Sequence, residues 1–412
     1  MTDDHLQSIV DELAARLTRS VAIDDPAIRL LAASRHFGDE DAVRVQSVLN
    51  RSVAPEIVAA ILGVGIAAWT RPGRFTLDLP DYQPRVCAPV RCNGLLLGYL
   101  WLIDRDGSLG AAEIGLAEDA ATRAGAVLYR RLVLHERAKA RHEAILRELV
   151  SSDPTTRTQA VEDLRAEQLL PEHPVCFQVL DVRCGGEDAN DTAAAVALEA
   201  AIEQGLRASA PEDVPLVVAN RSRAWVLLAT RQPPRRALLD TVGDRITARF
   251  HALGRHRGRV VVGVGAPVDS LGLVVESYRQ AGLAARAALL VPALGDVARW
   301  GELGPYEVLL KLPVDDLLLA ASVPALAALD AQDSHGVLLV TLETFLELAG
   351  DVRRTAERLH VHRATLYHRL KRIELHTGCR LDRGDDRLTL HLGLKLRALA
   401  AAYQTGATAG PS

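Results

Sequence analysis

Apolar residues change their spacing several times along the chain, and each spacing predicts a different kind of element. Ile9, Val10 and Leu13 recur at helical spacing, which predicts a helix over 6–17. The dipeptide Asn93-Gly94 separates an alternating segment from a continuous apolar one, and this order predicts a β-hairpin. By the same criteria, the first third of the chain contains a predicted strand that runs into a turn over 21–26, further predicted strands at 27–34, 85–91 and 95–103, and predicted helices at 43–62 and 111–128.

A long charged segment follows, from Tyr129 to Val150. Leu132, Ile145 and Leu149 form an irregular apolar stripe among arginine and glutamate residues. Two interpretations are open: a solvated linker helix between two domains, or a dimerising helix of the coiled-coil type. Pro154 ends the helix, because proline disfavours the helical conformation at the residue before it.

Strand and helix patterns then alternate from Pro174 to Leu312, which predicts an α+β sheet domain. Gly263 and Gly265 end one of these strands. A dinucleotide-binding loop would need a third glycine, and Pro267 follows instead, so a tight turn at the strand end is favoured. The predicted strands are 175–182, 214–219, 224–229 and 259–265, and the predicted helices are 193–208, 238–253 and 271–290.

Near the C-terminus, a helical pattern over 338–348 stops at Gly350. Asp351 is placed to cap the next helix, because its carboxylate can accept free backbone N–H groups. Ala356 is the small residue that a helix-turn-helix motif requires where its two helices cross. The pattern predicts the first helix of such a motif.

The turn of this motif is predicted at 360–362, and a second helix is predicted at 363–375. His360 is interpreted as a turn residue with a positive φ angle, which histidine tolerates better than a β-branched residue. The alternative, a zinc site formed by His360, His362 and His368, lacks a cysteine or acidic residue in register and is disfavoured. Leu366, Leu370 and Ile373 are expected in the core of the module.

The charge of this segment differs from that of the whole protein. The chain carries a net charge of −4, yet 353–380 contains eight arginine or lysine residues and two glutamates. Arginine can read guanine, and lysine and tyrosine often hold phosphates, so double-stranded DNA is the predicted partner rather than a merely solvated face. The predicted DNA-binding residues are Arg353, Arg354, His362, Arg363, Ala364, Thr365, Tyr367, His368, Lys371 and Arg372.

Composition adds several limits. The 412 residues are 49% hydrophobic and 24% charged, which is an ordinary globular balance with room for two to four domains. The five cysteines lack zinc-finger spacing, so reduced thiols are expected, and Cys87 and Cys92 are interpreted as strand residues rather than a redox pair. Neither a signal peptide nor a long apolar run occurs, so a cytoplasmic protein without a membrane segment is expected.

The stretches 341–346, 355–359, 361–374 and 388–392 resemble the C-terminal helix-turn-helix of PucR/CdaR-type bacterial regulators. The family often has asparagine where Ala364 stands and arginine where His368 stands, so these two positions affect the expected base preference. The resemblance implies a dimeric transcriptional regulator, usually an activator, that responds to a small molecule.

Two further resemblances concern the rest of the chain. Residues 260–265, 273–281 and 284–288 resemble the GGDEF-like middle domain of the same regulators, and 86–127 resembles a GAF domain, a small-molecule sensor fold. GGDEF enzymes need glycines and acidic residues at a hairpin to hold nucleotide phosphates and Mg²⁺. The hairpin here is Asn220-Arg221-Ser222-Arg223, and Asp181 alone could not hold two metals, so a regulatory role is expected.

The sequence therefore predicts a multidomain α+β protein that is not an enzyme and needs no cofactor or metal. The first alternative is a nucleotide-signalling enzyme of the diguanylate cyclase type with an accessory DNA-binding module, and the second is a nucleoid protein, which the large N-terminal region argues against. The predicted domains are a GAF-like sensor domain (1–128), a helical linker (129–153), a degenerate GGDEF-like α/β sheet domain (154–320), an all-α helix-turn-helix domain (334–403) and a disordered tail (404–412).

Overall fold

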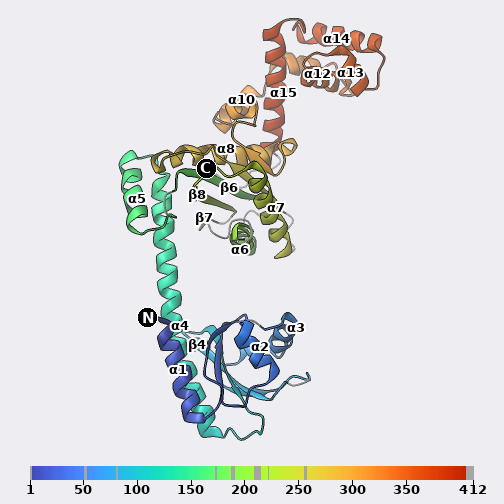
Figure 1. The fold of residues 1–412 in the computed structure, drawn as a ribbon. Helices are drawn as coiled ribbons and strands as arrows, with labels where there is room; N and C mark the ends of the chain where they lie inside the picture. Colours follow the sequence, from blue (N-terminus) through green and yellow to red (C-terminus); the bar gives the residue numbers. More distant parts are fainter. Residues whose placement is uncertain are drawn as a thin grey trace. The chain divides into compact units, whose positions relative to one another are not determined.

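The computed structural model describes residues 2–50, 53–79, 82–171, 174–186, 191–207, 215–220, 222–254 and 258–404. It divides into two compact units, residues 1–141 and 142–412, and each contains a five-stranded sheet with helices (Figure 1). The predicted multidomain class with mixed helix and sheet is confirmed. The predicted tail lies outside the described residues from position 405 on. None of the described helices is long and apolar enough to cross a membrane.

The N-terminal unit is an antiparallel sheet with the strand order β2-β1-β5-β4-β3. The β4–β5 hairpin turns at Asn93 and Gly94, whose φ angles are 50° and 79°, as the predicted two-residue turn requires. The elements in chain order are α1 (Thr2–Leu17), β1 (Val21–Asp24), β2 (Leu30–Ala33), α2 (Ala42–Asn50), α3 (Pro55–Gly63), η1 (Ile66–Ala68), β3 (Gly73–Phe75), β4 (Arg85–Cys92), β5 (Leu95–Ile103) and α4 (Ala111–Leu149).

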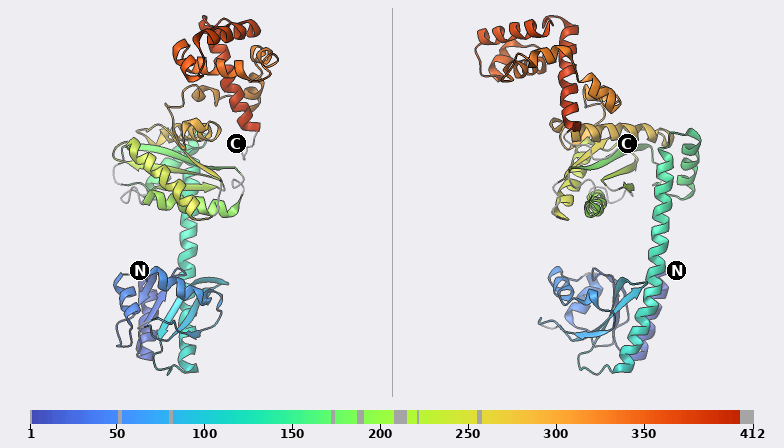
Figure 2. Two further views of the ribbon diagram at one scale, coloured as in Figure 1. Left: turned by 90° about the vertical axis from the view of Figure 1, so that its right-hand side faces the viewer. Right: turned by 180° about the vertical axis from the view of Figure 1, so that it is seen from behind.

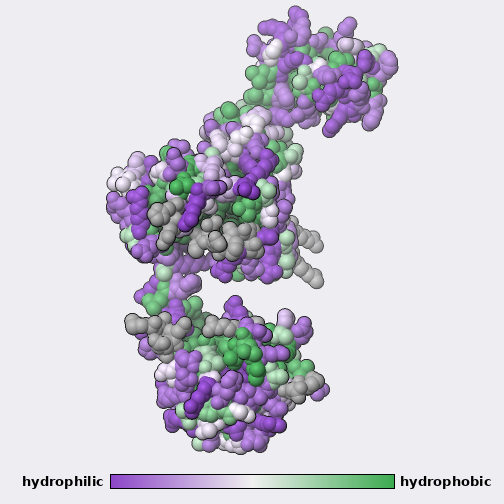
Figure 3. Space-filling model, viewed as in Figure 1, coloured by the Kyte–Doolittle hydropathy of each residue, from purple (hydrophilic) through white to green (hydrophobic). Residues whose placement is uncertain are grey.

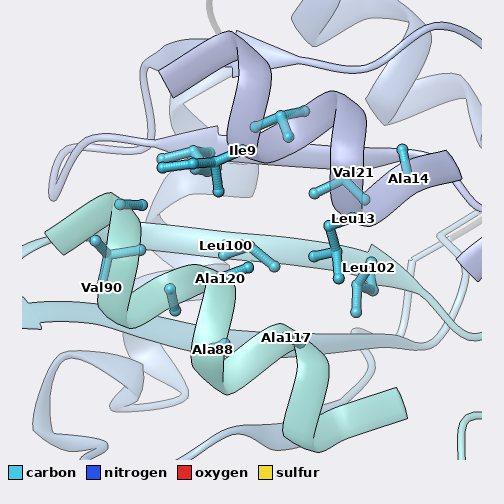
Figure 4. Packing of buried hydrophobic residues seen from close by; sticks show 14 of the residues in the cluster. Ile9, Leu13, Ala14, Val21, Ala88, Val90, Leu100, Leu102, Ala117 and Ala120 are labelled. Carbon is cyan, nitrogen blue, oxygen red and sulfur yellow. The ribbon is translucent and has the colours of Figure 1, made fainter. Parts of the chain in front are cut away.

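Helices α1 and α4 cover one face of this sheet. Figure 4 shows side chains of both helices converging on the strands, and the labelled residues are Ile9, Leu13, Ala14, Val21, Ala88, Val90, Leu100, Leu102, Ala117 and Ala120. The opposite face carries a second apolar cluster with residues from α3, η1 and β3. The sheet is thus buried on both sides, which explains the continuous apolar run of β5.

Three predictions for this unit were wrong in detail. The single helix predicted at 43–62 is two helices, because Pro55 has no N–H to continue a helix and stands at the first position of α3. The strand predicted from Ala27 begins at Leu30, because Ile28 adopts a φ of +60° and its N–H bonds to the Asp25 carbonyl at 2.9 Å. The helices predicted separately at 111–128 and 129–150 are one continuous helix: α4 runs on to Leu149, and no proline or glycine follows Gly125 within it.

In the second unit the sheet order is β10-β9-β6-β8-β7, with β10 parallel to β9 and the other pairs antiparallel. Helices α6 and α7 cover one face and α8 covers the other (Figures 1 and 2). The elements up to β10 are α5 (Pro154–Ala166), β6 (Cys176–Gly185), α6 (Thr192–Arg207), β7 (Leu216–Asn220), β8 (Arg223–Thr230), α7 (Arg236–Ala252), β9 (Arg259–Val264), η3 (Leu271–Leu273), α8 (Val274–Leu290), η4 (Pro292–Leu294) and β10 (Val297–Arg299).

Gly263 in β9 and Gly265 directly after the strand do not serve the tight turn that was expected. A Cβ atom on Gly263 would overlap the carbonyl oxygen of Ala281 and the amide nitrogen of Ala285, both in α8. A Cβ on Gly265 would overlap the carbonyl oxygen of Ser277 in the same way. Neither glycine has a positive φ. They are needed because the backbone of α8 lies directly on the strand.

The helices after β10 are α9 (Tyr306–Leu309), α10 (Val314–Ala320), α11 (Pro324–Asp330), α12 (Val337–Glu347), α13 (Val352–Arg358), α14 (Arg363–Thr377) and α15 (Gly384–Gln404). The sequence reading did not predict α5, β10, α9, α10 or α11. The last four have three to seven residues, which is too short for a periodic pattern to emerge.

Candidate nucleic-acid interface

Helices α13 and α14 and the turn between them form the helix-turn-helix motif that the sequence predicts. The Asp351 carboxylate accepts a hydrogen bond from the Arg354 N–H at 2.9 Å, and this bond lowers the pKa of Asp351. At the start of α14, His362 Nδ1 accepts from the Ala364 N–H at 3.3 Å. Both helices are therefore capped by side chains that stand where each begins.

The turn between the helices has the hydrogen-bond pattern of a Schellman motif. The Val361 N–H bonds to the Ala356 carbonyl at 3.0 Å, and the His360 N–H bonds to the Glu357 carbonyl at 3.2 Å. His360 has a φ of 52°, in the left-handed region that most side chains avoid. The interpretation of His360 as a positive-φ turn residue is therefore confirmed.

A buried apolar core fixes the orientation of α14. Leu366 and Ile373 are fully buried and Leu370 is 8% exposed, and they pack with residues of α12, α13 and α11. Ala356 is also buried, which confirms the predicted small residue at the approach of α13 to α14. The contribution of α11 to this core, through Leu326 and Leu329, was not predicted.

All ten predicted DNA-binding residues lie on the surface of this module. Tyr367 is 55% exposed, although it is aromatic. Two come from α13, one from the turn and seven from α14, so the face is built mainly by one helix. The surface of the module is largely hydrophilic in the view of Figure 3.

The arginines and lysine of this face form no ion pair in the part of the chain that the structure describes. In the structure as described, no hydrogen bond or ion pair engages the side chains of Arg353, Arg354, Arg363, Lys371 and Arg372. Arg358, which was counted among the basic residues but not assigned to the interface, is exposed in the same way. The uncompensated positive charge suits a polyanionic surface such as the phosphates of DNA.

Two other basic residues of the segment have structural roles. The Arg369 side chain is half-buried, and its Nη1 donates to Thr341 Oγ1 in α12 at 3.3 Å. Arg380 forms an ion pair with Asp382 at 2.7 Å. Sequence alone could not identify the partner of Arg369, because Thr341 lies on another helix, 28 residues away.

The structure brings no group of three or more histidine, cysteine, aspartate or glutamate side chains into a metal-binding arrangement, as far as its described residues go. Cys87 and Cys92 are both free thiols on β4. They stand five residues apart on one strand, which separates them by about 17 Å. They therefore cannot form a disulfide with each other within this fold.

Family models match two parts of the chain. Residues 338–396 match the PucR C-terminal helix-turn-helix domain, and residues 153–287 match a GGDEF-like domain. The chain is a regulator of the PucR/CdaR type. Its DNA-binding module is the helix-turn-helix built by α13 and α14, and it is a DNA-binding transcriptional regulator.

Relatives of similar length agree with this assignment. The chain is 21% identical over 95% of its length to the "Proline-responsive transcriptional activator PutR" of Bacillus subtilis, covering 96% of that protein. It is 23% identical over 96% of its length to the "DNA-binding transcriptional activator AdeR" of the same organism, covering 93%. A "Purine catabolism regulatory protein" of B. subtilis is 33% identical over 23% of this chain and 18% of its own length.

The GGDEF-like domain of this PucR/CdaR-type regulator contains a closed charge cluster at Asp181 in β6. The fully buried Asp181 carboxylate accepts from Arg183 Nε and Arg223 Nε, each at 2.9 Å. Arg223 also lies 5.1 Å from the centroid of the Tyr278 ring. Both carboxylate oxygens are thus engaged by guanidinium groups and the side chain is fully buried, which disfavours Asp181 as a ligand of a hard cation.

Proposed function

We propose that this regulator is a homodimeric, effector-responsive activator in the cytoplasm that binds an operator in double-stranded DNA through α14. The observation that supports it most strongly is the exposed face of α14. Its positive charges form no ion pair among the described residues, and the buried side of the helix supplies the core of a helix-turn-helix module. Activation is favoured because both relatives of similar length are named activators.

Each residue of the face receives a role from its chemistry. Arg363 and Ala364 stand at the start of α14, the end of a recognition helix that meets base edges. Lys371 lies two turns further on, where a lysine holds the DNA backbone, and Tyr367 lies between them. The ten residues from Arg353 to Arg372 predicted above remain the proposed interface.

For the N-terminal unit we propose a GAF-like sensor role. The sheet with helices on both faces is a suitable scaffold, and one relative is named as proline-responsive, which makes a small-molecule signal reasonable. Within α4, Leu132 and Leu134 are 36% and 50% exposed. Exposed leucines on a long charged helix support the proposal that α4 contributes to a dimer.

The alternative, a diguanylate cyclase with an accessory DNA-binding module, is disfavoured by the Asp181 cluster. Its two arginine partners occupy the oxygens that Mg²⁺ would need. We therefore propose that the GGDEF-like domain is not catalytic. Incubation of the full chain with GTP and Mg²⁺ should yield no cyclic dinucleotide above a control without protein, and product formation would refute this part.

The DNA-binding proposal is tested on the operator that genome-wide mapping of bound sites identifies. Arg363→Ala and Lys371→Ala should each weaken operator binding. The Lys371 change should also reduce the slope of log K against log salt by about 1 for each lost phosphate contact.

Arg380→Ala is the matched control, because it removes an arginine of the same module whose charge is already paired with Asp382. It should leave affinity and salt slope close to those of the unchanged protein. Equal affinity in all three variants, with folding intact by circular dichroism, would remove α14 from the interface.

A further inference from the structure

The face of the N-terminal sheet that lies away from α1 and α4 holds five aromatic rings. Phe75 lies at the centre, with its centroid 5.7 Å from Trp101, 6.2 Å from Trp69 and 6.3 Å from Tyr82. Tyr99 continues the cluster at 5.7 Å from Trp101. Most of these side chains are buried with isoleucines of α3 and η1. A buried aromatic cluster of this size can serve as core or as the lining of a ligand site.

Two buried hydroxyl groups in this cluster have no hydrogen-bond partner among the residues that the structure describes. They are Tyr82 Oη and Tyr99 Oη, in residues that are 6% and 0% exposed. Burial raises the pKa of both phenols, that of Tyr82 to about 12, so both stay protonated near neutral pH. Buried polar groups are almost always paired in native proteins, because an unmade bond costs free energy. Core packing alone does not explain two such hydroxyls in one cluster.

Two opposite charges are buried beside these rings. Asp24 ends β1 opposite Tyr99, and it is 6% exposed. Arg44 of α2 is 7% exposed, and its Nη2 donates to the Val21 carbonyl at 2.6 Å. Burial raises the pKa of Asp24 to about 6, an effect that the positive charge of Arg44 opposes. Among the described residues, no ion pair within 4 Å joins Asp24 to Arg44 or to another cation.

A second pair of buried charges in this region, Arg85 and Asp41, forms a direct ion pair. Arg85 Nη2 and Asp41 Oδ2 are 2.5 Å apart, and both side chains are buried. The Arg85 guanidinium also stacks at 4.0 Å from the Tyr82 ring centroid. Since this pair is closed, Asp24 and Arg44 are the charges that remain without a direct counter-ion. A buried charge without one is unfavourable unless a ligand completes it.

The same cluster includes a strained residue. Ile28 is 2% exposed and has a φ of +60°, which is an outlier for a β-branched side chain. Its side chain packs among Tyr99, Trp101 and their neighbours. Strain of this kind persists only where the surroundings hold it, and it is typical of sites that bind or switch.

We propose that this face binds an α-amino or α-imino acid as a zwitterion, with its ammonium group at Asp24 and its carboxylate at Arg44. A ligand with only one charge would leave one of these buried residues without a counter-ion. The Tyr82 and Tyr99 hydroxyls supply further hydrogen bonds, and the rings cover the aliphatic body. This proposal rests on the effector role proposed above, and it names the class of effector.

Ligand entry couples to movement of the β1–β2 turn. Ile28 packs in the same apolar cluster as Tyr99 and Trp101, so it gives way to a bound molecule and leaves its left-handed conformation. Release of this strain offsets part of the cost of opening the site. The turn is thus the first element that a bound effector displaces.

The test uses the full chain and the twenty proteinogenic L-amino acids as probes, each by thermal shift and then by calorimetry for those that raise the melting temperature. At least one should bind. For that amino acid, the amide, which lacks the carboxylate, and the deaminated acid, which lacks the ammonium group, should each bind at least about 10-fold more weakly, because each loses a charged hydrogen bond.

Asp24→Asn and Tyr99→Phe should weaken binding of the same amino acid, the first by about 10-fold or more. Asp119→Asn is the control. It removes an exposed carboxylate from the groove between α1 and α4, a cavity of about 390 Å³ lined by Glu12, Arg16, Asp119 and Arg123 among others, and it should not change binding. Folding of each variant is checked by its melting temperature without ligand.

Three results would overturn the proposal: no amino acid binds, the singly charged analogues bind as well as the amino acid, or only Asp119→Asn impairs binding. Operator binding without ligand is measured in parallel. If operator binding fails while the amino acid still binds, the regulator proposal fails and this one stands. If only ligand binding fails, the reverse holds.

Discussion

The backbone of His360 offers a direct test of how the helix-turn-helix is held. His360 occupies the position of the Schellman motif where glycine is most common, and its φ of 52° is unfavourable for a residue with a Cβ atom. The left-handed conformation costs about 1–2 kcal/mol for such residues. Glycine avoids that cost, but it loses about 0.5–1 kcal/mol through its greater freedom in the unfolded chain.

We therefore expect His360→Gly to stabilise the motif by about 0.5–1 kcal/mol, because the relief of strain exceeds the loss of entropy. His360→Val should destabilise it by about 1 kcal/mol or more, because a β-branched side chain tolerates this region worse than histidine. His360 is exposed, and its side chain forms no hydrogen bond or ion pair in the described structure, so these differences come from the backbone alone.

Gly378 provides the mirror-image control. It ends α14 with a φ of 68°, and a Cβ placed on it would meet open space. Gly378→Ala should therefore cost about 1 kcal/mol from backbone strain without any clash. His360→Gly removes the strain of a Cβ atom at a positive φ and adds the entropy cost of glycine, and Gly378→Ala does the reverse.

Hydrogen exchange measured by mass spectrometry on peptides from 352–377 is the suitable assay, because it reports the free energy of local opening in a chain with several domains. A gain of 0.5–1 kcal/mol corresponds to roughly 2- to 5-fold slower exchange. Faster exchange in His360→Gly, or unchanged exchange in His360→Val, would refute the reasoning. It would show that a side-chain contact of His360, not its backbone, sets the stability of the turn.

Two further predictions concern the sheets. Gly263→Ala should destabilise the GGDEF-like domain by about 3 kcal/mol or more, because the added methyl overlaps the backbone of α8, whereas Gly272→Ala, with only Ser270 Oγ at 3.8 Å, should change the denaturation midpoint little. Asp24 binds a proton more tightly in the folded state, since its pKa is raised from 3.8 to about 6, so its contribution to stability declines as pH rises from about 4 to 6. Asp24→Asn should remove that decline and stabilise the protein by up to about 3 kcal/mol above pH 6. If the melting temperatures of both proteins changed with pH in the same way across this range, the assigned burial of the charge would be contradicted.

Local patterns were sufficient wherever the physical cause is local. The Asn93-Gly94 turn, the Asp351 cap and the buried spacing of Leu366, Leu370 and Ile373 were all predicted and are all present. Each depends on residues within one or two helical turns of one another. The division of 43–62 into two helices has an equally local cause in Pro55, so that error came from the interpretation and not from a missing signal.

The candidate site was predictable in part for the same reason. The exposed positions of α14 follow from its apolar spacing, and the predicted face is exposed as expected. The structural partner of Arg369 was not predictable. Thr341 lies 28 residues from Arg369 in the sequence, so only the packing of α12 against α14 brings them together.

By itself, the sequence of this protein determined the helix-turn-helix and its basic face, because helix periodicity, caps and turn residues act over a few neighbouring positions. Tertiary structure alone decided which charged side chains form ion pairs and which do not. It paired Asp181 with two arginines and placed α8 directly on Gly263. It also left Asp24 and Arg44 buried without a direct counter-ion among the described residues. These outcomes depend on contacts between segments far apart in the chain, and such contacts follow from the packing of whole elements rather than from any local pattern.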